Sequence, residues 1–196
     1  MTDPNRAAIE AIYQRHLTKI KRAITAHLPR LRGLAAHCER IVEFGVKSGA
    51  SSSALLACPL VISYDLVPTH EARELQQAAG SRWDYRLQDT RTAPIEPCDL
   101  LFVDSLHTYD QVHAELTRHA DAVRRWLVFH DHLTFGSIGA NGETGKHLWT
   151  YQPGQSVPMN ALGIRPAIDN LMIRDRSWAV RSSYTDSHGL LVLERQ

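Results

Sequence analysis

The feature that most constrains the fold is the stretch Glu39–Asp65, in which two apolar runs flank a turn that contains two glycines. Residues 41–44 and 61–64 are short and apolar, as expected for strands that a parallel sheet buries on both faces. Gly45 and Gly49 bracket the turn, and a serine-rich segment after it offers helix caps. Strand, glycine turn, helix and strand in this order predict half of a nucleotide-binding βαβ unit.

Two cofactors fit this unit. A dinucleotide site needs G-x-G-x-x-G and an acid about 20 residues further on for the ribose hydroxyls. Asp65 stands at that distance from Gly45, but the glycines follow the pattern G-x-x-x-G and Glu43 precedes them. The order E-x-G-x-x-x-G resembles motif I of the class I S-adenosylmethionine (SAM) methyltransferases. An ordinary strand-to-helix turn without a ligand is the simplest alternative.

Length and charge limit the organisation of the chain. Its 196 residues suit one α/β domain, which we expect over residues 39–196 after a helical extension over residues 1–38. Lys and Arg number 22 against 21 Asp and Glu, which argues against nucleic acid as the main partner. Three cysteines without C-x-x-C spacing predict reduced thiols in a cytoplasmic protein. No signal peptide or membrane-length apolar run is evident, so we expect no membrane partner.

A second informative stretch surrounds Asp104. The apolar run 100–103 predicts a buried strand that ends at Asp104, and a helix follows with Val112 and Leu116 on one face. His107 falls in the loop between strand and helix, where open α/β sheets place their chemistry. The alternative is a loop histidine that caps the helix.

The run from Trp126 to Phe129 predicts a further strand, which ends in His130, Asp131 and His132. Adjacent strand ends would bring Asp104 and Asp131 together, and two carboxylates repel unless a proton or cation lies between them. Oxygen ligands with a nearby histidine suit Mg²⁺ or Mn²⁺, and a histidine-rich site would also take Zn²⁺ or Fe²⁺. We expect only one of the two histidines to bind the ion, and we favour His132. Alternatively, Asp131 hydrogen-bonds loop amides.

Helical spacing from Ile9 to Ile24 predicts an amphipathic N-terminal helix that packs on the domain or on a second subunit. Residues 31–38 predict a second, short helix. His27 lies between them and is either a helix-end histidine or a residue that faces the active site. Asp89 follows the third predicted strand and is either a turn former or a cofactor contact.

The C-terminal part begins with the long, glycine-rich stretch 136–163, which is typical of a lid or binding loop. Trp149 and Tyr151 within it would line a pocket or pack the loop onto the body. Residues 178–184 and 190–193 predict a closing β-hairpin. By analogy of fold, the whole pattern predicts an α/β, Rossmann-like, seven-stranded and mostly parallel sheet with helices on both faces.

Four motifs in collinear order, from about Leu28 onward, resemble a bacterial branch of the class I SAM-dependent methyltransferases. This branch includes the macrolide-sugar O-methyltransferases and the cephalosporin-hydroxylase-like proteins. The motifs are 43–51, 63–65, 99–109 and 129–131.

The resemblance implies O-methylation of a small-molecule hydroxyl, assisted by Mg²⁺ or another divalent ion. The residues that it places at SAM are Glu43, Gly45, Gly49, Ser51, Asp65 and, at the adenine, Asp89. Asp104 and Asp131 would hold the ion, and His107 would deprotonate the acceptor. The chain departs from its relatives at His132, where they usually have Thr or another small residue, and in having only one acid at 130–132.

Two other functions fit the sequence. The ribose acid allows an NAD-linked oxidoreductase, although the missing G-x-G weighs against it. A non-catalytic SAM-binding or metal-binding partner protein would share most of the same residues. The sequence does not identify the acceptor, and the N-terminal helix would suit a homo-oligomer interface.

Overall fold

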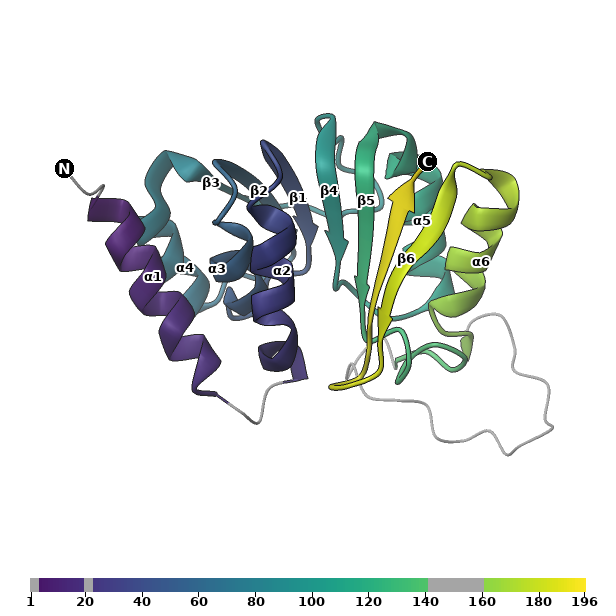
Figure 1. Ribbon diagram of the computed structural model, residues 1–196, viewed down its shortest axis with the longest axis horizontal. Helices are drawn as coiled ribbons and strands as arrows, with labels where there is room; N and C mark the ends of the chain where they lie inside the picture. The colour runs from purple at the N-terminus through teal and green to yellow at the C-terminus, as the bar shows by residue number, and fades with distance from the viewer. Residues whose placement is uncertain (1–3, 20–22, 141–160) are drawn as a thin grey trace.

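The protein folds around a seven-stranded sheet with the order β3-β2-β1-β4-β5-β7-β6, seen in a computed structural model that describes residues 4–19, 23–140 and 161–196 (Figure 1). Strands β1 to β5 are parallel, and β7 runs antiparallel between β5 and β6. The strands are β1 Arg40–Phe44, β2 Leu60–Asp65, β3 Trp83–Leu87, β4 Cys98–Val103, β5 Val123–His130, β6 Trp178–Tyr184 and β7 Leu190–Arg195. The predicted mostly parallel sheet with a closing hairpin is therefore confirmed.

Helices cover both faces of the sheet (Figure 1). They are α1 Pro4–Leu17, α2 Leu28–Ala35, α3 Ala50–Leu55, α4 His70–Ala79, α5 Tyr109–His119 and α6 Arg165–Arg174, with 3-10 turns η1 Ala23–His27, η2 Gly80–Arg82 and η3 Ala120–Ala122. Buried residues of α1 to α4 pack against one face and those of α5 and α6 against the other. The alternation of strand side chains divides the core in this way, because Ile41 faces the first cluster and Val42 the second.

The N-terminal helices differ in their bounds from the prediction. Helix α1 ends at Leu17 instead of continuing to Ile24. Helix α2 begins at Leu28 and ends at Ala35, earlier than the predicted residues 31–38. Pro29 lies in the first turn of α2, where a missing N–H costs no helix hydrogen bond, so it starts this helix rather than separating two.

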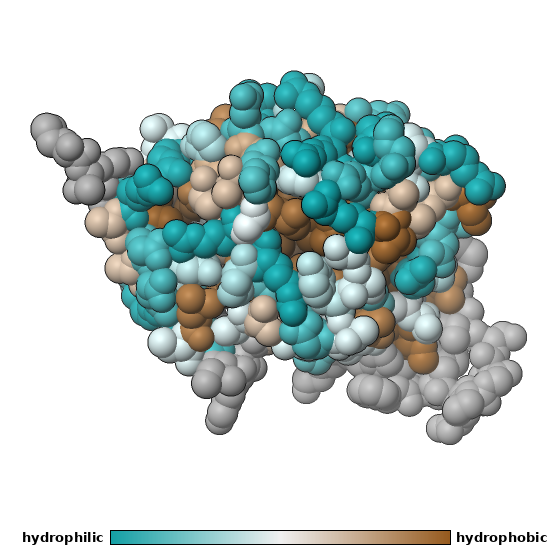
Figure 2. Space-filling view, in the orientation of Figure 1, coloured by the Kyte–Doolittle hydropathy of each residue, from teal (hydrophilic) through white to brown (hydrophobic). Residues whose placement is uncertain are grey.

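On the face that α1 to α4 cover, the part formed by β5, β7 and β6 is covered by arginine side chains beside a groove. A groove of about 390 Å³ lies between α2 and these strands, and Figure 2 shows apolar surface recessed between polar side chains there. The guanidinium of Arg125 lies 3.9 Å above the Trp126 ring, and that of Arg30 lies 4.1 Å above Tyr184. These arginines shield aromatic rings while their charged ends reach the surface.

Other predictions concern the loops and termini. Cys38, Cys58 and Cys98 are buried and unpaired, as expected for reduced thiols. Within the three described ranges, no helix has the length and apolarity needed to cross a membrane. Trp149 and Tyr151, predicted to line a pocket or to pack their loop onto the body, lie outside the described residues.

Candidate active site

A cavity of about 870 Å³ opens at the carboxyl ends of the parallel strands. Its wall includes the glycine turn after β1, the end of β2 and the loop after β3. It continues to the loop after β4 and to the last residues of β5. Open α/β sheets bind their ligands at this edge. The cavity therefore joins the predicted nucleotide motif to the predicted histidine and aspartate cluster.

The glycine turn is shaped by backbone that ordinary residues avoid. Gly45 has φ +86° and Gly49, the N-cap of α3, has φ +71°. A Cβ on Gly45 would collide with the carbonyl oxygen of Asp104 in the next strand. Only glycine lets the two chain segments approach this closely. Gly45 lines the cavity directly, whereas Gly49 lies behind it against Leu75.

Asp65 holds this turn in place. Its Oδ2 accepts hydrogen bonds from the backbone N–H groups of Val46 and Lys47, at 2.9 and 2.8 Å. Its Oδ1 accepts one from Leu66 at 2.7 Å. Oδ1 also accepts a longer hydrogen bond from Val67 N–H at 3.3 Å. Asp65 lines the cavity, so its carboxylate is within reach of a ligand there.

Glu43, a predicted SAM contact, lies behind the turn and is fully buried rather than on the cavity wall. Its carboxylate accepts the hydroxyls of Ser51 and Ser52, each at 2.6 Å, and of Ser63 at 2.5 Å. Burial raises the pKa of Glu43 to about 7, although the three serines oppose the shift. The described contacts of Glu43 therefore fasten α3 to β1 and β2. Ser51 reaches the cavity, so of this pair only the serine is placed to touch a ligand.

The loop after β3 supplies the opposite wall. Asp89 lines the cavity and forms an ion pair with Arg91 at 2.7 Å, which lowers the pKa of its carboxyl group. Beneath it, the buried Glu115 of α5 accepts the hydroxyl of Thr90 at 2.5 Å and that of Ser105 at 2.9 Å. This acid ties together the loops after β3 and β4, and its isolated position within a helix gave no sequence signal.

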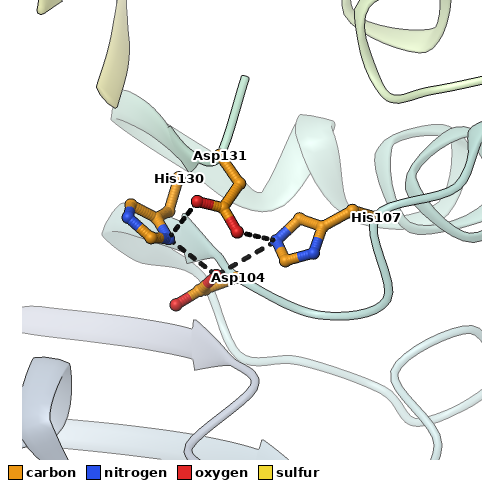
Figure 3. Close-up of side chains that lie close together, drawn as sticks. All are labelled: Asp104, His107, His130 and Asp131. Carbon is orange, nitrogen blue, oxygen red and sulfur yellow. Dashed lines mark hydrogen bonds and ion pairs between the residues drawn. The ribbon is translucent and has the colours of Figure 1, made fainter. Parts of the chain in front are cut away.

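Four side chains converge at the other end of the cavity (Figure 3). Nε2 of His107 lies 3.1 Å from Asp104 Oδ1 and 3.5 Å from Asp131 Oδ2. Nδ1 of His130 lies 3.1 Å from Asp104 Oδ1 and 3.2 Å from Asp131 Oδ1. One potential ligand atom from each residue falls within 4.8 Å of all the others. The predicted meeting of Asp104, His107 and Asp131 is thus observed.

The histidine of β5 that joins them is His130, which corrects the choice of His132. The strand ends at His130, and Asp131 adopts the left-handed conformation with φ +59°. This reversal turns the Asp131 carboxylate into the group and sends His132 toward the β6–β7 hairpin. There its ring lies against Gly189, and its Nε2 is 3.5 Å from Ser183 Oγ. Strand alternation would have placed His130 and His132 on one face and Asp131 on the other, so the left-handed conformation of Asp131 decides which histidine joins the group.

His107 is fixed from two sides. Its ring stacks on Phe135 with centroids 4.8 Å apart and an interplanar angle of 8°. Its backbone carbonyl accepts the N–H of Ala140 at 2.9 Å. Helix α5 begins just after it, with Thr108 as N-cap. His107 is partly exposed and lines the cavity, so its imidazole is both oriented and accessible to a ligand.

The electrostatics of the group separate its two acids. Burial opposes ionisation of Asp104, but His130 and His107 outweigh it and hold the pKa of Asp104 well below its usual range. For Asp131, burial prevails and raises the pKa of the carboxyl group. Burial also opposes the charge on His130, yet Asp104 and Asp131 overcome this and raise its pKa. The positive charge of protonated His130 is thus attracted by both carboxylates, Asp104 and Asp131, which both lie near it.

The donor set fits a divalent cation. Asp131 Oδ1 is buried and accepts no hydrogen bond of good geometry from the described residues. Two carboxylates that face one another, with imidazole nitrogens at ligand-to-ligand distances, are a typical arrangement around a metal ion. Asp104, Asp131 and His130 would hold such an ion.

The N-terminal segment completes the wall behind the group. His27 is fully buried, and its ring meets that of His130 edge-on, with centroids 5.5 Å apart. Arg30 donates a hydrogen bond to His27 Nδ1 at 2.9 Å, so this nitrogen carries no proton and Nε2–H donates to Ser187 O at 3.2 Å. Burial lowers the pKa of His27, consistent with a neutral ring. His27 is thus both the residue at the junction of η1 and α2, where its side chain makes no cap hydrogen bond, and a neighbour that supports the His130 ring.

Comparison with solved structures identifies the fold. An O-methyltransferase from Bacillus cereus with S-adenosylhomocysteine bound matches at a TM-score of 0.66 and 16% identity, over 100% of this chain and 92% of that chain. The O-methyltransferase TomG from Streptomyces achromogenes, in complex with SAM, matches at a TM-score of 0.65 and 15% identity, over 100% of this chain and 91% of that chain. The 1,6-didemethyltoxoflavin-N1-methyltransferase of Burkholderia thailandensis matches at a TM-score of 0.63 and 14% identity, over 100% of this chain and 92% of that chain.

No family model matches the sequence, and no curated protein sequence matches it significantly. At these low identities the structural likeness establishes the Rossmann-like methyltransferase fold. The chemistry of this chain has to be argued from its own site.

Proposed function

We propose that this protein is a SAM-dependent methyltransferase that methylates a hydroxyl group of a small molecule. The observation that carries the proposal is the continuous cavity of about 870 Å³. One end has the glycine turn and the ribose acid of a nucleotide site, and the other has a histidine between two carboxylates. A methyl donor and an acceptor would lie end to end in such a cavity.

The cofactor would occupy the end near β1 and β2. Gly45 allows the backbone to approach the amino-acid part of SAM, and Ser51 offers a hydroxyl nearby. Asp65 would bind the ribose hydroxyls, and Asp89 would lie near the adenine. The neighbours with SAM or S-adenosylhomocysteine bound support this arrangement, since they share the fold over the whole chain.

The acceptor would lie at the other end, beside His107. The sulfonium of SAM makes its methyl group electrophilic, so the protein has to hold an acceptor oxygen in line with it. A neutral hydroxyl is a weak nucleophile, and His107 is placed to accept its proton. Phe135 and the two carboxylates fix the orientation of that imidazole. A divalent ion, when bound, would lower the pKa of the acceptor hydroxyl.

Two rival functions remain to be tested. An NAD-linked oxidoreductase is disfavoured by the glycine spacing and by the antiparallel β7. A nitrogen acceptor is compatible with the fold, because the Burkholderia neighbour is an N-methyltransferase. We favour oxygen because a base beside a cation site serves an acceptor that must lose a proton. Mg²⁺, a small-molecule acceptor, a homo-oligomer and a cytoplasmic location stay predictions.

Calorimetric titration of the purified chain with S-adenosylhomocysteine, and separately with NAD, tests the cofactor. We expect micromolar binding of S-adenosylhomocysteine and none of NAD. Preferential binding of NAD would overturn the assignment, and failure of both would leave only the fold.

The role of His107 is tested once an acceptor has been found by screening hydroxyl compounds for methyl transfer. His107→Ala should leave S-adenosylhomocysteine affinity intact and lower turnover by roughly a hundredfold or more. His70→Ala is the matched control, because His70 is exposed at the start of α4 and does not line the cavity. Equal turnover of the two variants would remove His107 from the mechanism.

A further inference from the structure

The cation site contains a nitrogen donor that an oxygen-only Mg²⁺ site would lack. We propose that His130 is a direct ligand and that the site therefore selects a divalent first-row transition-metal ion, such as Mn²⁺, Fe²⁺, Co²⁺ or Zn²⁺, over Mg²⁺. This inference rests on the proposed function only in placing a cation beside the acceptor. It replaces the predicted ligand His132 with His130, and it narrows the predicted Mg²⁺ or other divalent ion to a transition-metal ion.

The geometry of His130 is that of a ligand. Its Nδ1 lies 3.1 Å from Asp104 Oδ1 and 3.2 Å from Asp131 Oδ1. Metal–ligand bonds of about 2.0–2.1 Å place neighbouring ligand atoms about 3.0 Å apart in an octahedron and about 3.3 Å apart in a tetrahedron. His130 Nδ1 is thus spaced from each carboxylate oxygen as one corner of a coordination polyhedron is from its neighbours.

The His130 ring has little freedom to turn away. It is the last residue of β5, is 3% exposed, and packs edge-on against the neutral His27. Its other nitrogen, Nε2, is buried without a hydrogen bond of good geometry to any described residue. The close contacts of Nδ1 are those with the two carboxylates. His107, in contrast, comes from a partly exposed loop and stays available to accept a proton.

The donor set decides which ions bind best. Mg²⁺ prefers six oxygen ligands and keeps several waters, so it gains little from an imidazole. The affinity of nitrogen and oxygen donors for divalent ions rises from Mn²⁺ through Fe²⁺ and Co²⁺ toward the end of the series. One buried imidazole with two carboxylates therefore favours a transition-metal ion, and the remaining positions are left for water or the acceptor.

Metal titration of the full-length, EDTA-treated protein tests the proposal without measuring activity. Calorimetry should show Mn²⁺, Co²⁺ and Zn²⁺ binding at least about a hundredfold more tightly than Mg²⁺. His130→Asn should reduce the difference to within about tenfold. His132→Asn is the matched control, because this buried neighbour lies outside the group, and it should retain the wild-type preference. His107→Ala should change metal affinity by less than about threefold.

A spectroscopic measurement on the wild-type protein keeps the test valid if His130→Asn fails to fold. Pulsed electron paramagnetic resonance of the Mn²⁺-loaded protein should show coupling to one imidazole nitrogen. Absence of nitrogen coupling, or Mg²⁺ binding as tightly as Mn²⁺, would overturn the proposal. So would binding of S-adenosylhomocysteine with no metal bound at all, and that result would leave the cofactor assignment standing. Selective metal binding without binding of S-adenosylhomocysteine would instead support the ion site and refute the proposed methyltransferase.

Discussion

Gly45→Ala is expected to damage both stability and ligand binding, because Gly45 is where β1 approaches the end of β4. A Cβ at this position collides with the carbonyl oxygen of Asp104, and its φ of +86° lies in the left-handed region. The obstacle is backbone just after β4, which a hydrogen bond from Asp104 N–H to Phe44 O at 2.9 Å holds against β1, so it cannot swing aside as a flexible side chain would.

The cost can be divided into two parts. A left-handed conformation costs a non-glycine residue about 1–2 kcal/mol. Relief of the overlap by shifting a packed backbone adds about 1–3 kcal/mol. A total of about 3 kcal/mol corresponds to a fall in melting temperature of roughly 10 °C for a chain of this length. Because the shift also moves the glycine turn that lines the proposed cofactor end of the cavity, affinity for S-adenosylhomocysteine should fall by about tenfold or more.

Gly33→Ala is the matched control. Gly33 lies in α2, and a Cβ there meets no atom within 4 Å. Alanine should stabilise this helix by about 0.5–1 kcal/mol and raise the melting temperature by about 2 °C. Thermal unfolding followed by circular dichroism, together with calorimetry of both variants, measures these effects. If Gly45→Ala melted and bound its ligand like the wild type, the close approach of β1 and β4 would be refuted.

Substitutions at three further positions test the residues that support the cavity. Burial raises the pKa of Glu43 from 4.5 to about 7, so the folded state binds the proton more tightly and stability is lost as pH rises through this range. We expect the free energy of unfolding of Glu43→Gln, measured with urea, to rise relative to that of the wild type by about 3 kcal/mol between pH 4 and pH 8. If the difference between the two proteins did not change with pH, the raised pKa of the buried Glu43 would be contradicted. Glu115→Ala should lower the free energy of unfolding by roughly 2–4 kcal/mol, because the hydroxyls of Thr90 and Ser105 lose their acceptor. Glu115→Gln should lower it less, and equal losses in the two variants would argue against the hydrogen-bond network. Asp65→Asn should weaken S-adenosylhomocysteine binding by roughly tenfold, measured by calorimetry, because an amide cannot accept on both sides as the carboxylate does.

Sequence patterns predicted those parts of the fold that depend on local signals. The apolar runs before Gly45 and Asp104 gave the central strands, and because parallel strands share one edge, they also predicted that the site residues meet there. The bounds of α1 and α2 were less predictable. Pro29 suits the first turn of a helix as well as it suits a break between helices, and the sequence alone does not distinguish the two.

Residue roles were predictable only where position within an element determines them. Glu43 has the sequence position of a ligand contact, but its side chain points to the face that α3 covers, and three serines engage it there. The choice between His130 and His132 depended on the conformation of Asp131. A single left-handed residue ends the alternation of the strand, and aspartate tolerates that conformation without marking it in the sequence.

The N-terminal segment shows why such a site cannot be derived from its motifs alone. Arg30 forms an ion pair with Asp186 at 2.8 Å, and His27 hydrogen-bonds the carbonyl of Ser187. These contacts join α2, near the start of the sequence, to the β6–β7 hairpin near its end. The hairpin also contacts Asp131, whose backbone N–H donates a hydrogen bond to Gly189 O at 2.9 Å. The residues expected to form an N-terminal extension thus wall the same group of acids and histidines that the strand ends create. The proposed cation site would consequently be built from three segments that are distant in the sequence, and its proposed metal preference would depend on a histidine whose orientation the N-terminal segment helps to maintain.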